Sequence, residues 1–160
     1  MKGVFFLAGE AGTQKSGLVD FAQLQLSQKY GKVSVFQPIG SNSDSLYSPK
    51  QAERMISTGQ TNVLLEQIIK AYKHTEQEND FVIVSGTELD SANIICEFRL
   101  NQLLAKHLCL PVVLVMRKNN EVNQSGECVA GILSASYINV IGVLTEAQQV
   151  MGLMDAAAQM

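Results

Sequence analysis

The sequence predicts a three-layer α/β domain, in which a parallel sheet of about five strands is covered by helices on both faces. Short apolar runs rich in Val and Ile are continuous rather than alternating, which is typical of strands buried on both faces. Segments with helical spacing of apolar residues separate these runs, and strand followed by helix, repeated, indicates crossover connections. The expected strands are residues 3–8, 32–39, 80–86, 110–116 and 138–144.

Composition favours one ordered domain over residues 1–160. Hydrophobic residues make up 46% of the 160 positions and charged residues 17%, enough for a real core. The net charge of -3 argues against a nucleic-acid partner, which would need clustered Lys and Arg. The three cysteines lack the spacing of a zinc site, so we expect reduced, partly buried thiols and a cytoplasmic location. They are Cys96, Cys109 and Cys128.

The first strand, GVFFLA, leads into a helix expected over residues 17–30. This N-terminal apolar run is too short for the core of a signal peptide or for a membrane span, so we expect no membrane partner. Pro38 ends the second strand, and the Ser-rich residues 40–48 are expected to form a mobile loop. The next helix is expected to begin with Ser48 as N-cap and Pro49 as its first residue.

Three further helices complete the expected pattern. Residues 62–74 place Val63, Leu64, Ile68 and Tyr72 near one helical face. Residues 94–108 form the next, and residues 145–160 a terminal helix capped by Thr145. Residues 118–127 are expected to be a loop. Asn101 faces the core side of its helix and is expected to hydrogen-bond a backbone group.

The segment after the first strand is the candidate site. A phosphate-binding loop reads G-x-x-x-x-G-K-[ST], and Gly12 and Gly17 stand at the spacing of its glycines. Leu18 follows in place of the lysine, and Lys15 lies inside the loop. Backbone N–H groups at a helix start still favour an anion. We therefore expect weak binding of phosphate or a nucleotide, without a metal or a tightly bound cofactor; the alternative is a simple tight turn. The candidate residues are Gly12, Thr13, Gln14, Lys15, Ser16 and Gly17.

Three blocks of sequence carry a family resemblance. SVFQPI, MISTGQTNVLLEQIIKAY and LNQLLAKHLCLPVVLVM resemble segments of the dethiobiotin-synthetase-like N-terminal domain of bacterial phosphate acetyltransferases. The blocks keep the family's order from residue 1 to about residue 116, and after that the match fades. The resemblance implies a P-loop NTPase-like fold with the first strand beside the third.

The resemblance also implies a function. Working dethiobiotin synthetases have a phosphate-loop lysine, a lysine before a proline and an acid after the third strand, and the resemblance puts Leu18, Gln37 and Ser85 there. It thus implies a non-catalytic regulatory or oligomerisation domain. The whole family enzyme interconverts acetyl-CoA and phosphate with acetyl phosphate and CoA. The implied partner is a second copy of the chain or the catalytic acetyltransferase domain.

Two alternatives stay open. One is an ATP-dependent ligase like dethiobiotin synthetase, which the three neutral residues disfavour. The other is a stand-alone module that binds a protein partner. The resemblance implies a longer family domain, so we expect the chain to be either a fragment or a reduced stand-alone protein. Glu88 and Asp90 follow the third strand, where an acid could reach a ligand; the alternative is a solvated loop.

Overall fold

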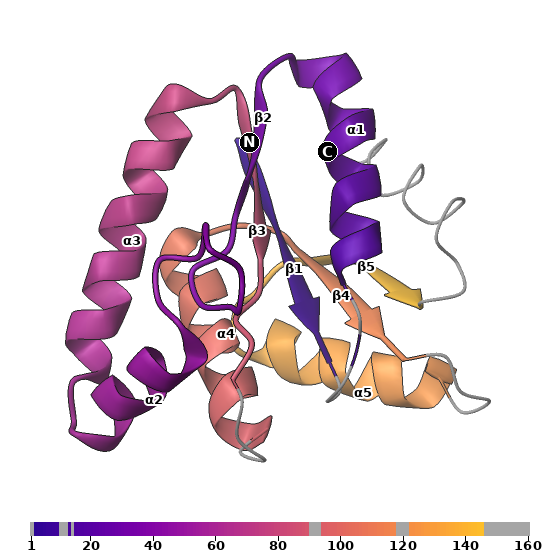
Figure 1. Ribbon diagram of the computed structural model, residues 1–160. Helices are drawn as coiled ribbons and strands as arrows, with labels where there is room; N and C mark the ends of the chain where they lie inside the picture. The colour runs from indigo at the N-terminus through magenta and orange to yellow at the C-terminus, as the bar shows by residue number, and fades with distance from the viewer. Residues whose placement is uncertain (1, 10–12, 14, 90–93, 118–121, 146–160) are drawn as a thin grey trace.

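The computed structural model describes residues 2–9, 13, 15–89, 94–117 and 122–145. At its centre is a five-stranded parallel sheet with the order β2-β3-β1-β4-β5 (Figure 1). The five predicted strands are confirmed, and β1 lies beside β3 as expected. The strands are β1 Gly3–Ala8, β2 Val33–Phe36, β3 Phe81–Ser85, β4 Val112–Met116 and β5 Val140–Thr145.

Helices connect successive strands. They are α1 Ser16–Tyr30, α2 Pro49–Ser57, α3 Thr61–Glu78, α4 Ile94–Leu108 and α5 Val122–Ala135. The predicted cap of α2 is confirmed: the Gln51 N–H donates to Ser48 Oγ and the Ser48 N–H donates to Gln51 Oε1, with Pro49 next in the chain. This reciprocal arrangement satisfies two N–H groups that a helix start leaves without intrahelical partners.

The prediction of a loop over residues 118–127 is wrong from Val122 onward, because α5 begins there. Residues 122–126 at the start of α5 are mostly polar and include Gly126, which conceals the helical pattern. Its apolar face comes later, from buried Leu133 and from the partly buried Val129 and Ala130. The expected cap of a terminal helix, Thr145, is instead the last residue of β5, and residues 146–160 lie outside the described residues.

Alternate residues of each strand serve the two faces of the sheet. Phe5 and Leu7 of β1 join one core cluster, whereas Val4 and Phe6 join the other. The first cluster is covered by side chains of α2, α3, α4 and α5, and the second by α1. Helices therefore cover both faces, as predicted. The residues of α1 in the second cluster are Leu18, Val19, Ala22 and Leu26.

Helix α3 departs from its predicted face in one position. Leu64, Leu65, Ile68 and Tyr72 are buried, but Val63 is 48% exposed. The Tyr72 hydroxyl is buried and has no hydrogen-bond partner among the described residues. Burial raises the pKa of Tyr72 well above its usual range, and the nearby Glu76 carboxylate adds to the increase.

Two further expectations concern the cysteines and the membrane. Cys96 is partly buried as expected, whereas Cys109 and Cys128 are exposed. Each of the three thiols is free. In the described part of the chain, no helix combines the length and the apolar character that crossing a membrane requires.

Candidate functional site

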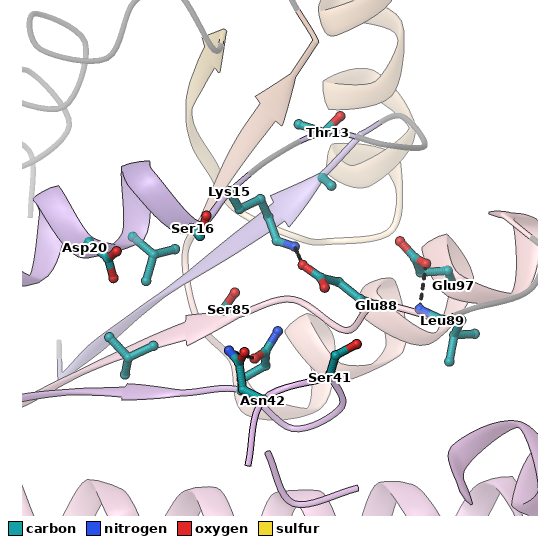
Figure 2. Close-up of a pocket in the computed structure, with 14 residues that line it drawn as sticks. Thr13, Lys15, Ser16, Asp20, Ser41, Asn42, Ser85, Glu88, Leu89 and Glu97 are labelled. Carbon is teal, nitrogen blue, oxygen red and sulfur yellow. Dashed lines mark hydrogen bonds and ion pairs between the residues drawn. The ribbon is translucent and has the colours of Figure 1, made fainter. Parts of the chain in front are cut away.

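A cavity of about 490 Å³ lies where β1 and β3 end, at the edge of the sheet where parallel α/β folds bind ligands. We call it the Lys15 cavity. Its walls come from the end of β1, the start of α1, the end of β2 with the loop that follows, the segment after β3, and α4 (Figure 2). The polar side chains that line it include Thr13, Lys15, Ser16, Asp20, Gln37, Ser85, Glu88 and Glu97.

Lys15 is the cation of this cavity. It is the N-cap residue of α1, and its side chain is only 2% exposed. Its Nζ lies 3.3 Å from Oε1 of Glu88, whose side chain is 52% exposed (Figure 2). A buried ammonium group needs an anionic partner, because the loss of its hydration is otherwise uncompensated. The pair thus joins the start of α1 to the segment after β3.

The structure corrects the register in which the phosphate loop was interpreted. Leu18, expected at the lysine position, lies inside α1 and is 1% exposed in the core cluster with Val4 and Phe6. The helix begins at Ser16, directly after Lys15. Counted from Gly9, the sequence GEAGTQKS fits G-x-x-x-x-G-K-[ST], except for glutamine at the second glycine.

Gly9 is the signal that the sequence analysis missed. A Cβ atom at this position would clash with Sδ of Met116, because the chain leaves β1 close against β4 and the Gly9 N–H donates to the Val115 carbonyl at 3.0 Å. A larger residue at this position would therefore force the Met116 side chain to move. Gly9 marks the start of the loop and puts Lys15 and Ser16 at the lysine and hydroxyl positions.

The structure places the six predicted loop residues in different positions relative to the cavity. Thr13, Lys15 and Ser16 line the cavity. Gly17 is the second residue of α1, has open space around the position of a Cβ atom, and is not among the residues that line the cavity. The other two, Gly12 and Gln14, lie outside the described residues, as does Asp90.

Asn101 of α4 holds the segment after β3. Its Oδ1 accepts hydrogen bonds from the N–H and the Oγ1 of Thr87, at 2.7 Å and 2.9 Å, and its Nδ2 donates to the Thr87 carbonyl at 3.3 Å. Asn101 is 1% exposed. The prediction that it hydrogen-bonds a backbone group is confirmed. This contact fixes the backbone immediately before Glu88.

The next two residues are also held through their backbone. The Glu88 N–H donates to the Ile39 carbonyl at 3.2 Å, and the Leu89 N–H donates to Oε2 of Glu97 at 2.9 Å. The backbone around Glu88 is thus held by two side chains of α4 and by a carbonyl group of the segment after β2. Both open interpretations of Glu88 agree in part with the structure: its carboxylate pairs with Lys15 at the cavity, and its side chain is 52% exposed.

Two further cavity residues are neutral where the family resemblance implies charge. Ser85 is 8% exposed and ends β3. The side-chain oxygen of Gln37 accepts hydrogen bonds from Asn42 Nδ2 at 3.0 Å and Ser45 Oγ at 3.3 Å. Gln37 therefore contacts the loop after β2.

The charge balance of the cavity is acidic among its described residues. Three carboxylates, from Asp20, Glu88 and Glu97, line the cavity together with Lys15. Among the described residues, no group of three or more His, Cys, Asp or Glu is arranged to hold a metal ion. An anion that enters the cavity meets one favourable charge and several unfavourable ones.

Comparison with known proteins gives consistent matches. The sequence profile of a family described as "AAA domain" matches residues 40–152. The chain is 36% identical to a phosphate acetyltransferase of Nitratidesulfovibrio vulgaris over 84 residues, which cover 52% of this chain and 12% of that protein. It is 31% identical to a phosphate acetyltransferase of Helicobacter pylori over 105 residues, covering 56% of this chain and 20% of the relative.

A third relative, the phosphate acetyltransferase of Pseudomonas aeruginosa, is 39% identical over 71 residues, with 44% of this chain and 10% of that protein covered. These matches confirm the resemblance to phosphate acetyltransferases that the sequence blocks indicate. They span only 10% to 20% of the length of these relatives.

Proposed function

The chain belongs to the AAA domain family, and on that premise we propose that it is a non-catalytic regulatory domain of the phosphate acetyltransferase type that binds a phosphate-bearing ligand in the Lys15 cavity. The partner in this proposal is a catalytic acetyltransferase domain or a second copy of the chain. We place the protein in the cytoplasm, which the free thiols support.

The observation that carries the proposal is the position of Lys15. Its buried ammonium group lies in the cavity at the first turn of α1, where backbone N–H groups and the helix dipole also favour negative charge. Ser16 adds a hydroxyl beside it. A lysine and a hydroxyl at the start of the first helix are the side chains with which a phosphate loop contacts its ligand.

The neutral residues Gln37 and Ser85 support a regulatory rather than a catalytic role. Phosphoryl transfer depends on positioning and on stabilisation of spread negative charge. Loss of one stabilising group typically lowers the rate by about 10²–10³. With Lys15 assigned to the lysine position in this proposal, Gln37 and Ser85 are the two positions at which charge is missing.

Phosphate titration of the ¹⁵N-labelled chain tests the binding part. We expect the amide signals of Thr13, Lys15 and Ser16 to shift first, with a Kd of about 0.1–1 mM. Lys15→Met should remove these shifts, because it deletes the ammonium group and keeps an unbranched side chain. Lys73→Met, which deletes an exposed lysine on α3, is the matched control and should bind like the original chain. Unchanged shifts in Lys15→Met would overturn the assignment of the site.

Activity assays test the non-catalytic part. With ATP or GTP and Mg²⁺ we expect the rate of hydrolysis to stay below about 1 s⁻¹, the lower end of ordinary enzyme turnover. With acetyl-CoA and phosphate we expect no acetyl phosphate. Nucleotide turnover that Lys15→Met abolishes would favour a dethiobiotin-synthetase-like ligase instead, and acetyl phosphate formation would place the catalytic unit in this chain.

A further inference from the structure

We propose that Glu88 is an internal competitor for the ligand of the Lys15 cavity and thereby sets its affinity. Oε1 of Glu88 lies 3.3 Å from Nζ of Lys15, so the carboxylate is already paired with the ammonium group. A phosphate-bearing ligand must displace this carboxylate before it can pair with Lys15. The inference rests on the proposed function, since it concerns binding at that same cavity.

The backbone on either side of Glu88 holds the carboxylate at this place. Asn101 fixes Thr87, and Glu97 accepts a hydrogen bond from the Leu89 N–H. The Glu88 N–H itself donates to Ile39. With the backbone held on both sides, rotation of the Glu88 side chain is the motion that opens the pair.

The two partners differ in their access to water. The Lys15 side chain is 2% exposed, whereas that of Glu88 is 52% exposed. A displaced Glu88 carboxylate can therefore be hydrated, while the buried ammonium group needs a new anionic partner. A phosphate oxygen meets that need. The exchange leaves both charges satisfied, which favours competition over simultaneous binding.

Charge repulsion also favours exchange. A phosphate that approached Lys15 with Glu88 still in place would lie next to a carboxylate, and like charges at short range repel. Asp20 and Glu97 line the same cavity and add to the repulsion. Unlike Glu88, Glu97 directs its Oε2 to the Leu89 N–H.

The test is titration with inorganic phosphate of the original chain, Glu88→Gln and Glu97→Gln. Both variants remove one negative charge from the same cavity, but only Glu88→Gln removes the charge paired with Lys15. We expect Glu88→Gln to lower the Kd for phosphate by about tenfold or more, and Glu97→Gln by about threefold or less. Thermal melting followed by circular dichroism establishes that each variant is folded.

Glu88→Asp is the second variant and carries the test if Glu88→Gln fails to fold. It keeps the cavity charge but shortens the side chain by one methylene, so that the carboxylate is drawn back from Lys15. A lower Kd at unchanged charge is the result that competition requires. An unchanged or higher Kd for the folded substitutions of Glu88 would overturn the inference.

The outcomes separate this inference from the proposed function. If Glu88→Gln and Glu97→Gln lower the Kd for phosphate equally and Lys15→Met abolishes binding, the competition by Glu88 is overturned. The ligand site at Lys15 would remain supported. If neither the original chain nor any variant binds phosphate, both the site and the competition are overturned. Selective tightening in the Glu88 variants supports both.

Discussion

Two lysine–glutamate ion pairs in this protein have similar geometry and different surroundings. Lys15 and Glu88 lie 3.3 Å apart and join α1 to the segment after β3 across 73 residues of sequence. Lys73 and Glu76 lie 3.1 Å apart within α3. The Lys15 side chain is 2% exposed and that of Lys73 is 56% exposed.

The difference shows that burial, rather than distance, decides what such a pair does. The two charges of an exposed pair are well hydrated whether or not they are in contact, so the pair contributes little to stability. A buried ammonium group has no water to return to, so its partner becomes a requirement of the fold or of the ligand. Six substitutions, grouped into four predictions, test the role of burial in order of decreasing effect.

A buried lysine without a carboxylate partner should have the largest effect. Leu18→Lys places an ammonium group in the α1 core cluster, where the present side chain is 1% exposed. We expect loss of about 3–5 kcal/mol in the free energy of unfolding, measured by urea denaturation. If Leu18 stood at the lysine position of the phosphate loop, the same substitution would instead tighten nucleotide binding.

Leu24→Lys is the matched control on the same helix. Leu24 is 62% exposed, so the new lysine remains hydrated and the free energy of unfolding should change by about 0.5 kcal/mol or less. A stable Leu18→Lys variant that binds nucleotide more tightly would contradict the register given by the structure.

Removing Glu88 and removing Lys15 should lower the free energy of unfolding by different amounts. Glu88→Ala leaves a buried ammonium group without this partner, and we expect a loss of about 1–3 kcal/mol in the free energy of unfolding. Lys15→Met leaves a half-exposed carboxylate that water can hydrate, so it should cost less. Denaturation of both variants measures the difference, and the reverse order would contradict the role of burial.

The Tyr72 hydroxyl is a buried polar group without a partner among the described residues. Replacing it by hydrogen in Tyr72→Phe should therefore raise the free energy of unfolding, by up to about 1 kcal/mol. Burial raises the pKa of Tyr72. Above pH of about 10 the unfolded chain loses this proton while the folded chain retains it, so stability falls as pH rises.

Denaturation at pH 8 and pH 11 measures this second effect. The original chain should lose more stability between the two pH values than Tyr72→Phe, because the other tyrosines are the same in both. Equal losses would show that Tyr72 titrates alike in the folded and unfolded chain.

The exposed pair should have the smallest effect. Lys73→Ala should lower the free energy of unfolding by about 0.2–0.5 kcal/mol, and the difference should shrink in 1 M salt because screening acts on exposed charges. Denaturation at low and high salt measures it. A cost as large as that of Glu88→Ala would break the comparison between the two pairs.

The sequence by itself determined the strands, most helix positions and the cap at Ser48. These features depend on neighbours along the chain: continuous apolar runs such as residues 3–8, and a serine followed by proline at a helix start. The side chain of Asn101 could also be assigned, because a polar group on a buried helical face needs a hydrogen-bond partner.

Only the tertiary structure decided the site. The chain leaves β1 at Gly9, close against Met116, and the burial of Leu18 against Val4 and Phe6 places that residue inside α1. Neither contact is visible in the local pattern, which offered Gly12 and Gly17 at the right spacing. The pairing of Lys15 with Glu88 follows from the adjacency of β1 and β3, because parallel strands bring their carboxyl ends together however far apart they lie in sequence.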